Sequence, residues 1–285
     1  VPGHAYSLSA FRRQGVFGEM LMAAIRAAGA HPDSFLAEYG PRQFEMTLAH
    51  DAALSAADAA VIAREMARGT AFRLESRAIF SPMPVADGSG NGVHIHFSLH
   101  DASGAPVTRD PNGPMELSAV AAHFAAGVLH HLPALCAVTA PSPVSYLRLT
   151  PNRWAPTVAD LKFQDRGAAL RICPVFDAAD EEQRNAEFNL EFRVCDAAAS
   201  PYMALGALIF AGADGIRKRL ALPPNEATLP ISLTAALDLM DASAAMKSWF
   251  GPVFFEAYIR HKRSEAAYVA DLPAEELCAR YADVY

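Results

Sequence analysis

The segment GVHIHFSLHD, residues 92–101, places two histidines and a serine at every second position, with an apolar residue in each gap. Because successive side chains of a β-strand point to opposite faces, His94, His96 and Ser98 share one face of a predicted strand. Imidazoles titrate near neutral pH, so a merely solvated face is made more simply from Thr, Lys or Glu. The alternation predicts either a half-buried strand with solvated histidines or a strand whose polar face forms a site.

Length, composition and charge restrict the class of protein. A chain of 285 residues can bury a large core, in one big domain or two smaller ones. Charged residues make up 19% and hydrophobic residues 52%, which favours a compact, helix-rich body over a disordered chain. The net charge of −7, with only 24 Lys and Arg, argues against a nucleic-acid partner. An anionic small ligand remains possible where arginines converge.

Cysteine spacing and hydropathy point to the compartment. Cys136, Cys173, Cys195 and Cys278 form no C-x-x-C pair, which predicts neither a zinc ribbon nor a disulfide framework and indicates a reducing, cytoplasmic location. We expect no membrane span, because no apolar run approaches the roughly 20 residues required and the run at 202–215 is broken by glycines. The chain starts with Val and without a signal-like segment, so we expect upstream sequence to be missing.

Periodicity predicts the principal elements. Helical spacing of apolar residues predicts helices at 6–29, ending at Gly29, and at 55–74, 115–132 and much of 201–285. His123, His130 and His131 on the third of these are interpreted as bystanders. The segment 85–92 is a glycine-rich loop, either a binding loop or a plain turn. The segment 140–158, rich in Pro and aromatic residues, is predicted to be a long loop of the kind that often carries function.

A hairpin is predicted for DSFLAEYGPRQFEMTL, residues 33–48, because Gly40-Pro41 separates two short strand-like runs. In a hairpin symmetrical about Pro41-Arg42, Glu38 faces Glu45 across the strands. Like charges in direct opposition need a cation, an arginine or a shared proton. A different register would leave both glutamates solvated, and periodicity does not decide between these alternatives.

A second alternating run, AEFNLEFRV at 186–194, predicts a strand with Glu187, Asn189, Glu191 and Arg193 on its polar face. Together the predicted polar faces offer carboxylates and imidazoles, which suit Mn²⁺, Mg²⁺ or Zn²⁺. Arginines complement carboxylate and phosphate oxygens through their planar forks. Metal ligands beside arginines form the arrangement needed to hold ATP phosphates during phosphoryl transfer. The arginines concerned are Arg148, Arg166, Arg171 and Arg193.

Several motifs, in the correct order, resemble the catalytic domain of the glutamine synthetase superfamily across essentially all 285 residues. GNGVHIHFSLHD (90–101) is similar to the family's Gly-x-Gly-x-His-x-His-x-Ser-Leu signature. SYLRLTP (145–151) is similar to its Ser-Tyr-x-Arg-Leu-x-Pro loop, and 190–216 to its Ile-Glu-x-Arg segment and the following helix. AEYGPRQFEM (37–46) and the Glu-Leu-x-x-Arg-Tyr pattern at 276–281 add support.

The resemblance implies an α+β fold in which antiparallel strands form a half-barrel active-site wall surrounded by helices. It implies that residues 1–285 are a catalytic domain without the family's small N-terminal domain and first metal-ligand strand. The implied site residues are the metal ligands Glu38, Glu45, His94 and Glu191; the nucleotide-binding His96 and Ser98; the glutamate-binding Gly90, Asn91, Arg148 and Arg193; and the phosphoryl-stabilising Arg166 and Arg171.

The implied chemistry uses ATP with Mg²⁺ or Mn²⁺ at two sites. ATP converts the γ-carboxylate of glutamate to an acyl phosphate, from which an amine displaces phosphate. Metal ions and arginines neutralise the oxygens that gain charge. The implied partners are small molecules and further copies of the same chain, assembled as a homo-oligomer and on the family pattern as a large ring.

Four positions depart from the family pattern. Trp154 stands where the family carries a glutamate that attracts ammonium and takes its proton. Asn189 stands where an arginine is usual, and Ser89 and Asn91 of the glycine loop are exchanged relative to the common order. A neutral indole cannot act as a base, but it can pack on an organic amine or make a cation–π contact with it.

Three functions are therefore considered. The first is an ATP-dependent carbon–nitrogen ligase that joins glutamate to an organic amine, with Trp154 as an acceptor-site residue. The second is a glutamine synthetase that uses ammonia. The third is a metal- or nucleotide-binding pseudoenzyme, against which the retained metal-ligand and arginine set argues.

Overall fold

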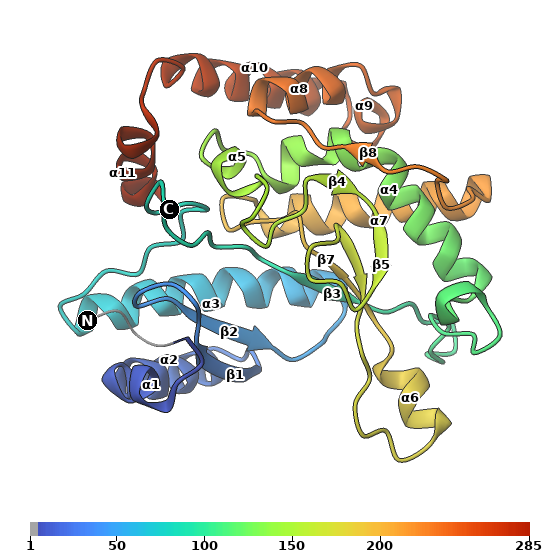
Figure 1. Ribbon diagram of the computed structural model, residues 1–285, viewed down its shortest axis with the longest axis horizontal. Coiled ribbons are helices and arrows are strands. Elements are labelled where there is room, and N and C mark those ends of the chain that lie inside the picture. Colours follow the sequence, from blue (N-terminus) through green and yellow to red (C-terminus); the bar gives the residue numbers. More distant parts are fainter. Residues whose placement is uncertain (1–4) are drawn as a thin grey trace.

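The computed structural model describes residues 5–285, in which helices surround a set of short strands (Figure 1). The helices are α1 (Leu8–Arg13), α2 (Gly15–Ala27), α3 (Ala53–Arg73), α4 (Ala119–Thr139), α5 (Ser145–Arg148), α6 (Glu181–Glu187), α7 (Pro201–Lys218), α8 (Leu233–Asp241), α9 (Ala244–Phe250), α10 (Pro252–Tyr268) and α11 (Ala274–Val284), with a 3-10 turn at Pro114–Glu116. The strands are β1 (Pro32–Ala37), β2 (Phe44–Leu48), β3 (Ile95–Phe97), β4 (Val158–Ala159), β5 (Leu161–Phe163), β6 (Leu170–Ile172), β7 (Leu190–Phe192) and β8 (Ala227–Thr228).

The largest apolar core surrounds α4, which packs along α7 and against α8. Glycines allow α4 and α7 to approach closely. A Cβ atom on Gly215 would lie 2.1 Å from the carbonyl oxygen of His123, and one on Gly127 would lie 2.2 Å from that of Ala211. The glycines that interrupt the apolar run at 202–215 thus serve helix packing.

Helix α4 also corrects one expectation. It is long and apolar enough to cross a membrane by length and composition alone, contrary to the prediction that no run has this character. Of its most apolar 18-residue window, 67% is buried inside the protein. Its apolar composition follows from its position, since a helix surrounded by other elements needs apolar side chains on most of its faces.

A smaller core lies between α2, α3 and the β1–β2 hairpin, where Leu21, Ile25 and Ala63 are buried. In Figure 1 this part lies on the opposite side of the central strands from α8, α9 and α10. Helices α2 and α3 therefore pack against the hairpin. Glu45 lies on β2 and Glu38 directly follows β1, and both glutamates lie on the side of the central sheet.

The central sheet has the strand order β3-β7-β6-β5. Strand β7 pairs antiparallel with β3 and β6, whereas β5 runs parallel to β6. The parallel β5–β6 pair differs from the antiparallel wall that was expected, because the loop 164–169 returns the chain to the start of β5 before β6 begins. The Asp160 side chain and carbonyl accept from the backbone N–H groups of Ala169 and Leu170 and hold that return. The predicted α+β class is confirmed.

Most predicted elements are present with altered limits. The helix predicted at 6–29 is divided at Gln14 into α1 and α2 and stops before Gly29, whose φ of 87° ends it. The long loop at 140–158 contains the one-turn helix α5. The strand predicted at 186–194 shortens to β7, because Asp180 caps α6 and Glu187 is the last residue of that helix.

Candidate active site

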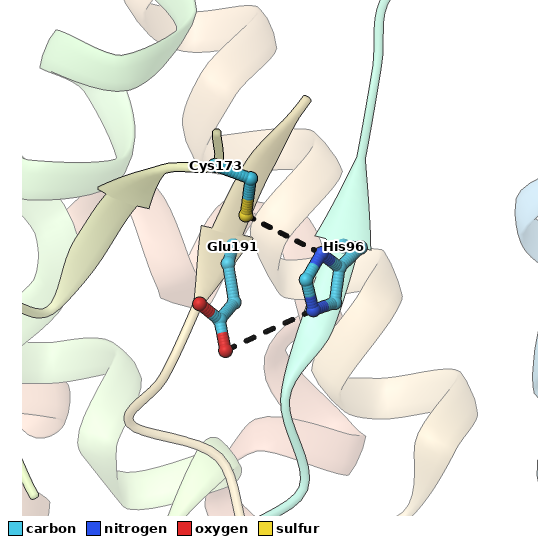
Figure 2. A group of neighbouring side chains, drawn as sticks. All are labelled: His96, Cys173 and Glu191. Carbon is cyan, nitrogen blue, oxygen red and sulfur yellow. Dashed lines mark hydrogen bonds and ion pairs between the residues drawn. The ribbon is translucent and has the colours of Figure 1, made fainter. Parts of the chain in front are cut away.

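A row of polar side chains crosses the central sheet. Glu191 on β7 is the cross-strand partner of His96 on β3 and of Arg171 on β6, so the three side chains share one face. Figure 2 shows the His96 ring joined through one nitrogen to the Cys173 thiol and through the other to the Glu191 carboxylate, with Cys173 directly after β6. The register of three short strands therefore builds the centre of the site.

Glu191 is only 2% exposed and is surrounded by cationic groups. Arg193 Nη1 lies 2.5 Å from its Oε1, and Arg171 Nε lies 2.6 Å from its Oε2. Burial opposes the charge of Glu191, but the hydrogen bond from His94 and the charge of Arg193 outweigh it and lower the pKa to about 2. Glu191 is thus an ionised carboxylate at neutral pH.

The two histidines of the opening segment are in different environments. His94 Nδ1 lies 3.0 Å from Glu191 Oε1, and desolvation lowers the pKa of this imidazole despite that contact. His96 Nδ1 forms hydrogen bonds with Cys173 Sγ and with Asn189 Oδ1. These contacts raise the pKa of His96, and the Cys173 contact has the largest effect. Both imidazoles are exposed to solvent and also contact the buried Glu191 carboxylate, so the alternation marks the open face of a site.

The register of the β1–β2 hairpin differs from the expected one. Glu45 is paired with Leu36, and Glu38 donates its backbone N–H to the carbonyl of Gln43, so the two glutamates are diagonal and not directly opposed. The turn is centred one residue earlier than predicted, because Gln43 Oε1 accepts from the N–H of Gly40 at 2.8 Å.

The two glutamates still interact, because diagonal neighbours on one face of a hairpin lie within side-chain reach. Residue Glu45 is exposed, yet its carboxyl group is crowded. Desolvation, the Glu38 carboxyl group and the charge of Glu191 raise the pKa of Glu45 to about 7. Three carboxylates from β1–β2 and β7 thus converge without sufficient positive charge beside Glu45.

The glycine-rich loop lies against Arg148. This arginine is 3% exposed, and its Nη2 donates to the carbonyls of Val194 and Cys195. A Cβ on Gly90 would lie 2.6 Å from Arg148 Cγ, and one on Gly92 would lie 3.2 Å from Arg148 Nη1. The glycines are therefore required by the close approach of a buried arginine, a reason that spacing does not reveal.

Asn91 of this loop uses its side chain within the protein. Its Nδ2 donates to the Ser81 carbonyl at 2.8 Å, and its Oδ1 accepts from Gln43 Nε2 at 2.6 Å. The predicted substrate-binding residue thus shapes the loop, while Gln43, which the sequence pattern did not single out, joins the loop to the hairpin.

A pocket of about 440 Å³ opens beside the central row. Its lining includes His96, Arg166, Arg171, Cys173 and Asn189. Two predicted phosphoryl-stabilising arginines therefore meet the predicted nucleotide-binding histidine in one cavity. Cys173 was assigned no role at the site from the sequence, because its position showed only that it forms no C-x-x-C pair. Its burial beside His96 follows from the end of β6 and has no local sequence signal.

The remaining predicted residues lie near the rim. Ser98 follows β3, and its hydroxyl is 3.2 Å from His100 Nε2. Trp154 is 65% exposed, and its ring meets that of Tyr39 edge to face at 4.8 Å between centroids. Tyr39 follows Glu38 directly and donates its N–H to Glu38 Oε2. A further unpredicted residue, Tyr6, donates its hydroxyl to the same oxygen at 3.3 Å.

The model of the glutamine synthetase catalytic domain matches residues 2–281. The chain belongs to the glutamine synthetase family. Gamma-glutamylpolyamine synthetase GlnA3 of Streptomyces coelicolor is 35% identical over 278 residues, which cover 92% of this chain and 59% of the relative. The glutamine synthetase of Methanocaldococcus jannaschii is 30% identical over 263 residues, covering 86% and 56%. The chain thus spans somewhat over half the length of these two glutamine synthetase relatives.

Solved glutamine synthetase relatives share the fold. A crystal structure of a novel glutamine synthase homolog superposes with a TM-score of 0.93 at 42% identity, covering all of this chain and 66% of the other. A GmaS/ADP complex superposes with a TM-score of 0.82 at 27% identity, covering 94% and 64%.

The donor set fits the divalent cation expected in a glutamine synthetase fold. Desolvation, the Glu38 carboxyl group and the charge of Glu191 raise the pKa of Glu45, so carboxyl groups from the hairpin and from β7 lie close together. Oxygen ligands of this kind suit Mg²⁺ and Mn²⁺. His96, Cys173 and Glu191 also place one ligand atom each within 4.8 Å of one another.

Proposed function

We propose that residues 1–285 are a glutamine synthetase-type catalytic domain of an ATP-dependent ligase that joins the γ-carboxyl group of glutamate to an organic amine. One observation carries the proposal. An exposed, neutral indole, Trp154, is packed on Tyr39 beside the convergent carboxylates, and the motif resemblance assigns this position to an acidic residue of the family. A polyamine-specific name among the relatives supports the same acceptor class.

The metal ions would be held by Glu38 and Glu45 at one site and by His94 and Glu191 at the other. The convergence of these groups supports this assignment. Mg²⁺ or Mn²⁺ held there would neutralise the charge of the ATP phosphates. Arg171, which already pairs with Glu191, and Arg166 in the same cavity would stabilise the transferring phosphoryl group.

The substrates would lie on either side of this centre. His96 and Ser98 would contact the nucleotide, and a family relative described as an ADP complex supports a nucleotide site in this fold. Gly90 and Asn91 would contact glutamate, with Arg148 packed against the loop and Arg193 beside His94. Arg148 would act mainly through the loop, because its other terminal nitrogen is committed to backbone carbonyls.

The reaction would proceed in two steps, a phosphoryl transfer and then an acyl transfer. A γ-carboxylate oxygen of glutamate takes the terminal phosphoryl group of ATP, and ADP leaves. The amine nitrogen then attacks the acyl carbon, inorganic phosphate leaves with the electron pair of the broken C–O bond, and the new amide loses a proton to solvent. Because Trp154 cannot accept that proton, an amine already deprotonated or held through its carbon skeleton is favoured over ammonium.

The experiment is release of inorganic phosphate by the intact protein with ATP, glutamate and Mg²⁺ or Mn²⁺. Ammonium, alkylamines, arylamines and polyamines are compared as acceptors. Turnover with an organic amine and little with ammonium supports the proposal. Brisk ammonium-dependent release identifies a glutamine synthetase instead, as the names of several relatives would allow. No phosphate release with any acceptor, in a protein that still binds ATP, identifies a pseudoenzyme.

We further propose that the protein acts in the cytoplasm as a homo-oligomer, on the family pattern a large ring. Four unpaired, buried cysteines and the need for ATP support the compartment. Exposed apolar side chains such as Phe72, Ile231 and Val253 offer surface for contacts between copies. Sedimentation velocity of the intact protein tests the assembly, and a monomer at micromolar concentration would contradict it.

A further inference from the structure

Three segments that are distant in the chain meet at the rim of the site. They are the hairpin turn 38–43, the glycine-rich loop 85–92 and the segment 149–155 after α5. Tyr39 and Trp154 join the first segment to the third through their rings. Gln43 joins the first to the second, since its Nε2 donates to the Gly90 carbonyl at 2.9 Å and to Asn91 Oδ1.

Arg153 joins the third segment to the glycine-rich loop. Its Nη1 donates to the carbonyl of Gly88 and its Nη2 to the carbonyl of Ala86, both at 2.8 Å. A planar guanidinium can bind two neighbouring carbonyls at once with little further loss of freedom, whereas a lysine ammonium lacks this fixed fork. The side chain is half-buried, so both bonds are partly shielded from water.

The backbone around Arg153 is held in an unfavourable conformation. Asn152 has a φ of 66° and Trp154 a φ of 50°, so both neighbours are in the left-handed region. Such a conformation persists in residues other than glycine where surrounding contacts determine it. The two hydrogen bonds of Arg153 lie between these residues and hold this part of the backbone to the glycine-rich loop.

We propose that Arg153 is a positioning residue that couples the acceptor subsite at Trp154 to the glutamate subsite at Gly90 and Asn91. This inference rests on the proposed function. Arg153 directly precedes Trp154 in the chain, and it holds the glycine-rich loop at 86–88 while Gln43 holds it at 90–91. The contacts of Tyr39 with Trp154, of Gln43 with Gly90 and of Arg153 with Gly88 connect all three segments, so a change in one subsite displaces the other. A displacement of about 1 Å is sufficient to reduce turnover strongly.

The test compares Arg153→Ala, Arg153→Lys and the control Arg263→Ala in the intact protein. Arg263 also uses both terminal nitrogens, on Asp238 and Asp241, but it lies on α10 with half-exposed partners of its own. We expect Arg153→Ala to raise the KM values for glutamate and for the amine about 10-fold or more each, with the KM for ATP within about 2-fold of wild type. Arg153→Lys should recover only part of the loss, because one ammonium replaces a two-carbonyl fork.

Hydrogen exchange provides a readout that does not need activity. The N–H groups of Gly88 and Asn91 donate to the carbonyls of Val85 and Pro82. Their exchange should become about 10-fold faster in Arg153→Ala and stay unchanged in Arg263→Ala, with α3 unaffected in both. Unchanged exchange, or faster exchange with an unchanged KM for glutamate, would overturn the inference. If the wild type turns over no acceptor, the proposed function fails, and exchange alone then decides whether the two loops are coupled.

Discussion

Tyr39 and Trp154, from the hairpin turn and from the segment after α5, meet edge to face with 4.8 Å between their ring centroids. This contact sets an apolar wall beside Glu38, whose carboxylate accepts from the Tyr39 N–H. An ammonium ion has no carbon skeleton to pack against such a wall, whereas an alkyl or aryl amine buries apolar surface on it.

Trp154→Glu should therefore change the preferred acceptor. A carboxylate at this position can attract ammonium and take its proton, so the ratio of kcat/KM for ammonium to that for the organic amine should rise about 10-fold or more. Trp154→Phe, which keeps an apolar ring, is the matched control and should retain the amine preference. Equal ratios in all three proteins would show that the indole does not select the acceptor.

Glu191→Gln should abolish turnover while leaving much of the side-chain volume in place. The substitution removes the charge that faces His94, Arg171 and Arg193, and with it a proposed metal ligand. We expect phosphate release to fall by about 100-fold or more. Glu187→Gln, at the exposed end of α6, should stay within about 2-fold. A Glu191→Gln protein that keeps a third of wild-type activity would exclude Glu191 as a ligand.

Two glycines of α7 should respond in opposite directions to the same substitution. Gly215→Ala places a Cβ 2.1 Å from the His123 carbonyl oxygen, so it should lower the free energy of unfolding by about 1–3 kcal/mol. Gly206→Ala has no atom within 4 Å of its new Cβ and should raise that free energy by up to about 1 kcal/mol. Urea denaturation measures both, and equal effects would contradict the close packing of α4 on α7.

The free energy of unfolding should decrease as the pH is lowered, because His131 becomes protonated. This imidazole is buried on α4 beside His130 and Lys218, with its Nε2 2.9 Å from Asp214 Oδ2. Desolvation lowers its pKa despite the Asp214 contact. The neutral form is therefore favoured in the folded state, and stability present above the ordinary pKa near 6.5 is lost as pH falls below it.

The slope contributed by one such proton is at most about 1.4 kcal/mol per pH unit. His131→Gln should remove that slope between pH 7 and pH 5 in urea midpoints, whereas His130→Gln, at an exposed position, should keep it. The lowered pKa of Asp214 acts only in stronger acid, below its ordinary value near 3.8. A wild-type slope in His131→Gln would assign the acid sensitivity to another group.

The sequence by itself determined the local elements and the residue types of the site. Alternation at 92–101 predicted the face that His94 and His96 share, and the apolar spacing predicted α3 and α4, because period and side-chain direction are local properties of a strand or helix. The family motifs depend on the same local order.

The tertiary structure decided which of these residues meet. The hairpin, whose register pairs Glu45 with Leu36, is held to the distant glycine-rich loop by Gln43, which donates to the Gly90 carbonyl and to Asn91 Oδ1. The burial of Arg148 beneath Gly90 and the contact of Cys173 with His96 depend on neighbours far away in the chain. Strand order and packing choose such neighbours through the burial of the whole core, so no local pattern in the sequence contains them.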